Sequence, residues 1–207
     1  MNHFSRACFV SLALGASIVA GLSACAPVVI GGAVMGSLVA TDRRTAGAQL
    51  EDEGIELRAQ SRLREALGER AHVNVTSYNR QVLLTGEVPN TQDRQLAEQV
   101  VTKVENVRST VNELAVLGNT TLSQRSADVL VSGRVRAGLV DAKDLFANAF
   151  KVVAERGTVY MMGRVTQREA DRATDIVRST TGVQKVVRLL EIISEEELKA
   201  LLPKPAP

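Results

Sequence analysis

Residues 83–88 read LLTGEV, and residues 160–165 read YMMGRV, 77 positions later. When the two stretches are superposed, their glycines coincide and apolar residues fall over apolar residues on both sides. Downstream the match continues with an offset of 76 after a one-residue deletion. Upstream, an offset of 72 places Arg62-Leu63-Arg64 over Arg134-Val135-Arg136. Matching apolar positions with variable polar ones indicate two copies of one structural unit.

Each copy has the pattern of an α-β-β-α-β unit. In the first copy, apolar residues recur every fourth position on one helical face and then alternate through a hairpin that turns near Tyr78-Asn79-Arg80. The second copy repeats this order with a helix near 126–139, a turn at 155–157 and a helix over 168–179. The sequence therefore predicts an α+β fold of two tandem domains, each a small three-stranded mixed sheet packed by two helices.

The chain is expected to divide into five segments. These are a signal peptide, a lipidated tether with a linker, a first domain, a second domain, and a C-terminal helix with its tail, over residues 1–24, 25–48, 49–117, 118–193 and 194–207. The last helix is indicated by the capping-box pattern Ser194-x-x-Glu197. Gly86 and Gly163 are each expected where a strand gives way to the second helix of its unit, supplying a backbone angle or a close packing that a side chain would block.

The N-terminus has the parts of a bacterial export signal. Arg6 precedes an uncharged apolar run over residues 7–21, which is too short to span a bilayer. The run ends in Leu22-Ser23-Ala24-Cys25, which matches the lipobox of bacterial lipoproteins. In that class the cysteine receives a diacylglyceryl group and its new amine an N-acyl chain, so we expect a covalent lipid on Cys25 and no other cofactor. The alternative is an ordinary secretory signal with a chance cysteine.

Composition excludes several classes of function. Removal of Arg6 with the signal lowers the formal charge from +2 to +1, and aromatic residues are 3% of the chain, so neither a basic field nor stacking platforms for nucleic acid are present. After removal of the signal, His72 is the only histidine and Cys25 the only cysteine, which argues against a zinc site. No pairing of a nucleophile with a base stands out, and we expect the protein not to be an enzyme.

The first helix of the second unit has an unusual outer face. With Ala127, Val131 and Val135 placed toward the core, a helical wheel turns six residues outward or to the edge of that face: Val129, Leu130, Gly133, Arg134, Arg136 and Ala137. The corresponding face of the first unit is much more polar. An apolar patch flanked by arginines is typical of a helix that docks on an anionic bilayer. Packing of the patch against the first domain or the C-terminal helix is the alternative.

The duplicated unit, with Gly86-Glu87-Val88 and Gly163-Arg164-Val165 after the hairpins, resembles the BON domain of bacterial envelope proteins. Two such units behind a lipobox, with the linker motif 41–45 (TDRRT), resemble the dual-BON outer-membrane lipoproteins associated with division and outer-membrane stress. The residue after Cys25 is Ala26, whereas an aspartate would signal retention in the inner membrane. The resemblance thus implies a lipid-anchored protein on the periplasmic face of the outer membrane.

In function, the resemblance implies a non-enzymatic protein that binds anionic phospholipid, chiefly phosphatidylglycerol, through the first helix of its second BON domain. It also implies a role in envelope integrity at division sites. One departure is Leu130, which stands where the family places a tryptophan near the start of this helix. The other hypothesis from the residues is a tethered adaptor that binds envelope or cell-wall proteins without specific lipid recognition. Segment 26–40 is expected to be a leash or to contact lipid or protein.

Overall fold

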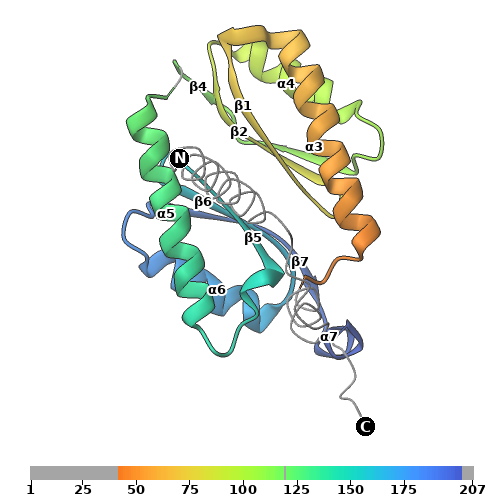
Figure 1. Ribbon diagram of the computed structural model, residues 1–207, viewed down its shortest axis with the longest axis vertical. Helices are drawn as coiled ribbons and strands as arrows, with labels where there is room; N and C mark the ends of the chain where they lie inside the picture. The colour runs from red at the N-terminus through yellow and green to blue at the C-terminus, as the bar shows by residue number, and fades with distance from the viewer. Residues whose placement is uncertain (1–41, 119, 202–207) are drawn as a thin grey trace, which may run out of the picture. The chain divides into compact units, whose positions relative to one another are not determined.

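The computed structural model describes residues 42–118 and 120–201 (Figure 1). The signal peptide, Cys25, most of the predicted tether and the tail after Leu201 lie outside these residues. The described residues belong to one compact unit. Within it, the first repeat consists of α3 (Ala46–Leu67), η2 (Gly68–Arg70), β1 (His72–Tyr78), β2 (Gln81–Val88), α4 (Thr91–Thr102), β3 (Ser109–Asn112) and β4 (Ala115–Val116).

The second repeat has the same order of elements. It consists of α5 (Leu122–Asp141), η3 (Ala147–Ala149), β5 (Phe150–Glu155), β6 (Thr158–Thr166), α6 (Gln167–Ser179) and β7 (Lys185–Ile193), followed by α7 (Glu195–Leu201). In each repeat the hairpin is antiparallel, the last strand runs parallel to the second, and two helices cover one face of the sheet (Figure 1). The predicted α+β class and the two tandem α-β-β-α-β domains are confirmed.

The last strand of the first repeat departs from the predicted single strand. It is divided into β3 and β4, which both pair with β2. Between them, the Asn112 side-chain oxygen accepts a hydrogen bond from the backbone N–H of Leu114 at 3.2 Å, a local turn that competes with the ladder. Leu114 is thereby buried in the core. In the second repeat β7 pairs with β6 without interruption along nine residues.

The core faces of the first helices follow the predicted four-residue spacing. In α3 the buried apolar residues are Ile55, Ala59, Leu63 and Leu67, and in α5 they are Val131, Val135 and Leu139. The prediction that Ala127 faces the core is wrong, because Ala127 is exposed and Asp128 is buried beside it.

The two hairpin turns lie where they were predicted. Both central residues of each turn have positive φ: Asn79 (48°) and Arg80 (66°) in the first, and Arg156 (52°) and Gly157 (72°) in the second. Positive φ at both positions is the signature of a type I′ turn, whose twist suits a two-residue hairpin. The turns are therefore equivalent in the two repeats.

Each turn is held by an aspartate of the preceding helix. Asp52 accepts hydrogen bonds from the backbone N–H groups of Asn79 and Arg80, at 2.7 and 2.8 Å. Asp128 accepts two equivalent bonds in the second repeat, at 2.9 and 3.1 Å. The two aspartates are 76 positions apart. The offset of 72 predicted for the first helices is thus wrong by one helical turn.

Gly86 and Gly163 lie inside β2 and β6, not at the ends of these strands. A Cβ at Gly86 would stand 2.0 Å from the carbonyl oxygen of His72, and the residue has a φ of 110°. A Cβ at Gly163 would stand 2.5 Å from the carbonyl oxygen of Ala149. In both sheets the first strand therefore approaches the second so closely that a side chain would collide with its backbone.

Candidate functional site

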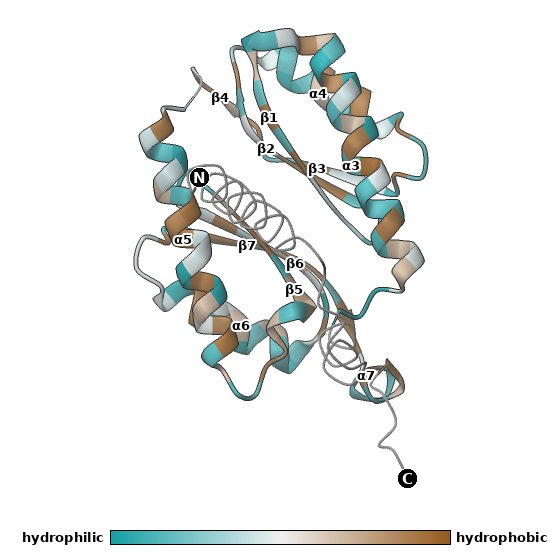
Figure 2. Cartoon of the chain, in the orientation of Figure 1, coloured by the Kyte–Doolittle hydropathy of each residue, from teal (hydrophilic) through white to brown (hydrophobic). Residues whose placement is uncertain are grey.

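Helix α5 extends beyond the helix predicted near 126–139 at both ends. Thr121 caps its N-terminus in a capping box with Gln124, and the helix continues to Asp141. Its inner face contributes Val131, Val135 and Leu139 to the core of the second repeat. The remaining face is turned away from that core, and Figure 2 shows that hydrophobic residues recur along the whole helix.

The six residues predicted on the outer face of this helix are all exposed: Val129, Leu130, Gly133, Arg134, Arg136 and Ala137. Val129 is 71% exposed and Leu130 is 60% exposed. A Cβ at Gly133 would meet no atom within 4 Å. The wheel was therefore oriented correctly for these residues, although its core side was wrong at Ala127.

Two further apolar residues extend this face at its ends. Leu122 is 80% exposed and Val140 is 68% exposed. We call the six residues Leu122, Val129, Leu130, Gly133, Ala137 and Val140 the apolar stripe. From Leu122 to Val140 it runs about 27 Å along the helix at 1.5 Å per residue. The sequence prediction missed its ends because it began the helix at 126 and stopped at 139.

Arginines flank the apolar stripe without acidic partners. Arg125, Arg134 and Arg136 each donate a hydrogen bond only to a neutral oxygen: the Thr120 hydroxyl and the carbonyls of Thr181 and Val152, at 3.3, 3.4 and 3.4 Å. None of the three pairs with a carboxylate in the described part of the chain. Of the two aspartates on α5, Asp128 is committed to the hairpin turn, and Asp141 is the last residue of the helix. The outer face is thus apolar and cationic.

The same positions on α3 are acidic. With the offset of 76, Glu51, Glu53 and Glu56 correspond to Ala127, Val129 and Ser132. Glu51 accepts a hydrogen bond from Arg58 at 2.7 Å. The counterpart of Arg58 is Arg134. On α5 an alanine stands in place of the glutamate, and Arg134 pairs with no carboxylate among the described residues.

Comparison with known proteins identifies the repeated unit. The sequence profile of the BON domain family matches residues 51–118 and 127–194, which together make up more than half of the chain. The chain belongs to the BON domain family. The two matches begin 76 residues apart, the offset that the paired aspartates define.

Relatives extend the match beyond the two BON domains. The chain is 35% identical over 185 residues to Outer membrane lipoprotein DolP of Haemophilus influenzae, covering 88% of the chain and 95% of that protein. It is 30% identical over 154 residues to a 21 kDa hemolysin of Actinobacillus pleuropneumoniae, covering 73% of the chain and 79% of the relative. The chain is accordingly an outer-membrane lipoprotein with two BON domains.

Among solved structures, CdsD, a structural protein of the type III secretion system of Chlamydia trachomatis, is 14% identical with a TM-score of 0.30. The alignment covers 70% of the chain and 95% of CdsD, and at that score the likeness adds nothing to the assignment. Within residues 42–118 and 120–201, no helix has the length and apolar character needed to cross a membrane. In the same residues no group of three or more His, Cys, Asp or Glu could hold a metal ion.

The segment before the first BON domain is an ordered connection between both BON domains. Arg43 donates two hydrogen bonds of 2.7 Å to the carboxylate of Glu169 on α6, and a third to the carbonyl of Arg164. Burial alone would raise the pKa of Glu169, but the bonds from Arg43 and the Thr166 backbone outweigh it and lower that pKa. Both side chains are nearly inaccessible, with 3% and 1% exposed.

Arg44 points to the first BON domain instead. It bonds to Asp42 and Asp52, and its guanidinium lies 4.3 Å from the centre of the Tyr78 ring. Burial alone would lower the pKa of Arg44, but the two carboxylates raise it overall. The linker predicted over 25–48 is therefore a fixed contact in its described part, and α3 begins at Ala46, before the predicted domain start at 49. Arg43 thus binds the second BON domain and Arg44 binds the first.

The sheets of the two BON domains also meet directly. A third apolar cluster consists of Tyr78 and Leu83 from the first domain and Tyr160 and Met162 from the second. Lys151 of β5 reaches Glu56 of α3 with a bond of 2.7 Å, and Asn79 bonds to Glu191 at 2.7 Å. These contacts, together with Arg43, hold the two BON domains as neighbours.

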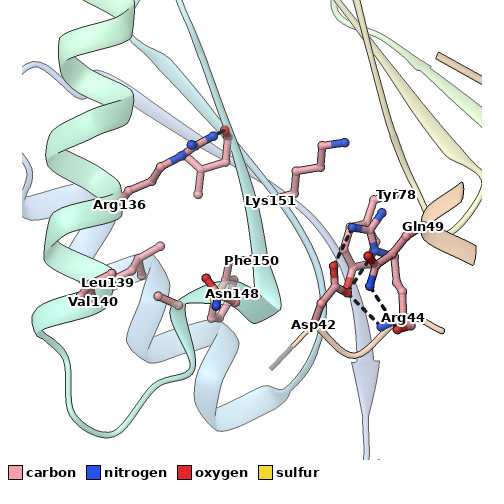
Figure 3. A pocket seen from close by; sticks show the side chains of 12 residues that line it. Asp42, Arg44, Gln49, Tyr78, Arg136, Leu139, Val140, Asn148, Phe150 and Lys151 are labelled. Atoms are coloured by element: carbon pink, nitrogen blue, oxygen red, sulfur yellow. Dashed lines mark hydrogen bonds and ion pairs between the residues drawn. The ribbon is translucent and has the colours of Figure 1, made fainter. Parts of the chain in front are cut away.

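A pocket of about 550 Å³ lies at the C-terminal end of α5 (Figure 3). Its walls include Arg136 and Val140 of α5, Phe150 and Lys151 of β5, and Asp42 and Arg44 of the segment before α3. The sequence prediction missed this pocket. Its walls come from segments about 100 residues apart in the sequence, and only folding brings them together.

Proposed function

We propose that this outer-membrane lipoprotein is non-enzymatic and binds anionic phospholipid, such as phosphatidylglycerol, through α5 of its second BON domain. In this proposal Cys25 carries the diacylglyceryl and N-acyl chains, and the BON domains face the periplasm and support envelope integrity at division sites. The observation that carries the proposal is the apolar stripe of α5, flanked by three arginines that have no carboxylate partner among the described residues.

The physical chemistry of a bilayer surface suits this face. An amphipathic helix lies in the interface with its apolar side among the acyl chains and its cations at the phosphates. Each arginine or lysine near an anionic surface contributes about 1 kcal/mol. The three arginines of α5 lie beside the stripe, so they reach the headgroups when the stripe enters the interface. A zwitterionic surface offers the apolar contribution without this electrostatic one.

Leu130 takes the place of the aromatic residue that the family resemblance leads one to expect. Tryptophan prefers the headgroup level of a membrane, whereas leucine prefers hydrocarbon. Here the exposed area of Leu122, Val129 and Val140 adds to that of Leu130. We therefore propose binding that is distributed along the helix instead of centred on one anchor.

The decisive experiment is co-flotation of an acyl-free fragment, residues 38–207, with phosphatidylglycerol vesicles and with zwitterionic vesicles. This fragment contains all the residues of both cores and of the contacts between the BON domains. Removal of the anchor is necessary because acyl chains contribute about 0.8 kcal/mol per buried CH₂ and would mask headgroup binding. We expect selective flotation with the anionic vesicles at low salt.

The variant Leu130→Asp is expected to reduce affinity about tenfold or more, because a buried leucine contributes about 1.5–3 kcal/mol. Leu57→Asp is the matched control: Leu57 is 73% exposed and lies on α3, the equivalent helix. It should float like the parent fragment. If the parent fragment does not float at low salt, or if both variants lose binding equally, lipid binding by α5 is excluded and the stripe is to be crosslinked as a protein-binding surface.

A further inference from the structure

The pocket at the end of α5 has the composition of a site for a single amphipathic ligand (Figure 3). Its volume of about 550 Å³ lies within the range of small-molecule sites. Val140 and Phe150 supply apolar wall, and polar groups converge from α5, β5 and the segment before α3. Val140 is also the last member of the apolar stripe, so the pocket and the stripe form one continuous surface.

Arg136 is the cation in this pocket that is available to an anion. Its guanidinium has five N–H donors, and its bond to the carbonyl of Val152 is long at 3.4 Å. The other two cations already have acidic partners. Arg44 is bound by Asp42 and Asp52, and Lys151 donates to Glu56 and to the carbonyl of Ser77. Their role is to fix the walls, and Lys151 keeps one of its three N–H donors for a ligand.

We propose that this pocket binds the phosphodiester group of one phospholipid molecule, with Arg136 as its principal cationic partner. The inference rests on the proposed function and deepens it, because it gives α5 a headgroup site in addition to an insertion surface. Arginine suits this ligand because its planar fork matches two phosphate oxygens. The acyl chains leave the pocket past Val140 and continue along the apolar stripe. Because Arg136 is the one cation available to the ligand among the described residues that line the pocket, and Asp42 lies nearby, the pocket favours a monoanion over a dianion.

The position of Asp42 indicates which membrane supplies the lipid. Asp42 is a pocket wall and the first described residue, and Cys25 precedes it by 17 positions in the sequence. Seventeen extended residues span at most about 60 Å. If Cys25 carries the anchor, as proposed, the leaflet that holds it lies within about 60 Å of Asp42, so lipids of that leaflet are the expected ligands of the pocket.

The test titrates the 38–207 fragment with dihexanoyl-phosphatidylglycerol below its critical micelle concentration. Binding is monitored by NMR of the backbone amides. We expect saturable one-to-one shifts of the Arg136, Phe150 and Lys151 amides. Arg136→Gln should weaken binding about tenfold, the loss of one charge-assisted hydrogen bond. Arg62→Gln is the matched control, because Arg62 is also exposed, donates to the backbone carbonyl of Lys103 and lies on α3, outside the pocket and outside the apolar stripe. It should leave monomeric lipid binding unchanged.

The outcomes separate this proposal from the proposed function. If vesicles bind but the monomeric lipid causes no saturable shifts at the pocket, or if the two arginine variants behave alike, the headgroup site is wrong and α5 acts only as a surface. If the monomer binds in the pocket while vesicles do not bind, the headgroup site stands and membrane docking fails. If inorganic phosphate binds as tightly as the lipid, the pocket is a phosphate site and the phospholipid assignment is overturned.

Discussion

Helices α3 and α5 hold the same place in the two BON domains and make the same internal contacts. Each places an aspartate on its hairpin turn and a row of apolar residues in its core. Their outer faces differ, since Glu51 and Glu53 of α3 correspond to Ala127 and Val129 of α5. Core and turn contacts constrain one side of a duplicated helix and leave the other free to change. The functional difference between the BON domains is therefore to be sought on that outer side.

The second helices show a related contrast. Asp93 of α4 and Glu169 of α6 occupy the same third position after the helix cap, 76 residues apart. Asp93 pairs with Arg70 of its own domain, whose side chain is 50% exposed. Glu169 pairs with Arg43, which comes from the segment before the first BON domain and is buried. The same acidic position thus serves a local contact in one domain and a contact between domains in the other.

The largest loss of stability is expected from breaking the buried ion pair between Arg43 and Glu169. Arg43→Ala leaves Glu169 as an uncompensated buried charge, which costs about 3–5 kcal/mol of stability. Arg70→Ala removes an exposed partner from Asp93 and should cost less than about 1 kcal/mol. Urea unfolding of the two variants, followed by circular dichroism at pH 7, measures the difference. Equal urea midpoints for the two variants would contradict a stabilising role for the buried Arg43–Glu169 pair between the BON domains.

An intermediate loss of stability is expected from removing the aspartates that hold the hairpin turns. Asp128→Ala leaves two backbone N–H groups without their partner and should cost about 1–3 kcal/mol. Asp52→Ala should cost more, because Asp52 also accepts bonds from Ser77 and Arg44, both at 2.7 Å. Urea unfolding of both variants at pH 7 compares them, and a larger loss for Asp128→Ala would contradict this ranking.

The cost of Asp52→Ala should depend on pH. Burial alone would raise the pKa of Asp52, but hydrogen bonds from Ser77, the turn backbone and Arg44 lower it below its ordinary value of 3.8. A carboxyl whose pKa is lowered by folding stabilises the fold above its unfolded pKa and loses this contribution as pH falls through its folded pKa. The difference between parent and variant should therefore shrink below about pH 3.8. A difference that grows on acidification would rule out a charged Asp52 as the stabilising group.

The sequence predicts what is periodic in this fold and misses what is not. Alternation and four-residue spacing located the strands, the turns and the core residues of α3. The same periodicity misled the superposition of α5 on α3, because sliding a helix by four residues keeps apolar residues over apolar residues. The offset became unambiguous only through Asp52 and Asp128, which bond to turns distant in the sequence.

The sequence around Arg43 did not predict its contacts either. Its partner Glu169 lies 126 positions away, and the polar motif around Arg43 has the composition of a linker. The exposed side of α5 was predictable because exposure follows from the wheel once the core face is known. The pocket at its end was not, since a cavity depends on how distant elements pack.

The smallest effect on stability is expected from introducing into α5 a glutamate at the position equivalent to Glu51 of α3. Ala127→Glu places a carboxylate where Glu51 stands relative to Arg58, so it should pair with Arg134 and change stability by less than about 0.5 kcal/mol. The added negative charge should weaken binding to phosphatidylglycerol vesicles about fivefold, or about 1 kcal/mol. The reverse change, Glu51→Ala on α3, frees Arg58 but leaves Glu53 and Glu56 in place, so vesicle affinity should stay within about twofold. Vesicle titrations of both variants compare the helices directly. Unchanged affinity in Ala127→Glu would mean that the apolar stripe alone, and not the loss of acidic residues, separates α5 from α3.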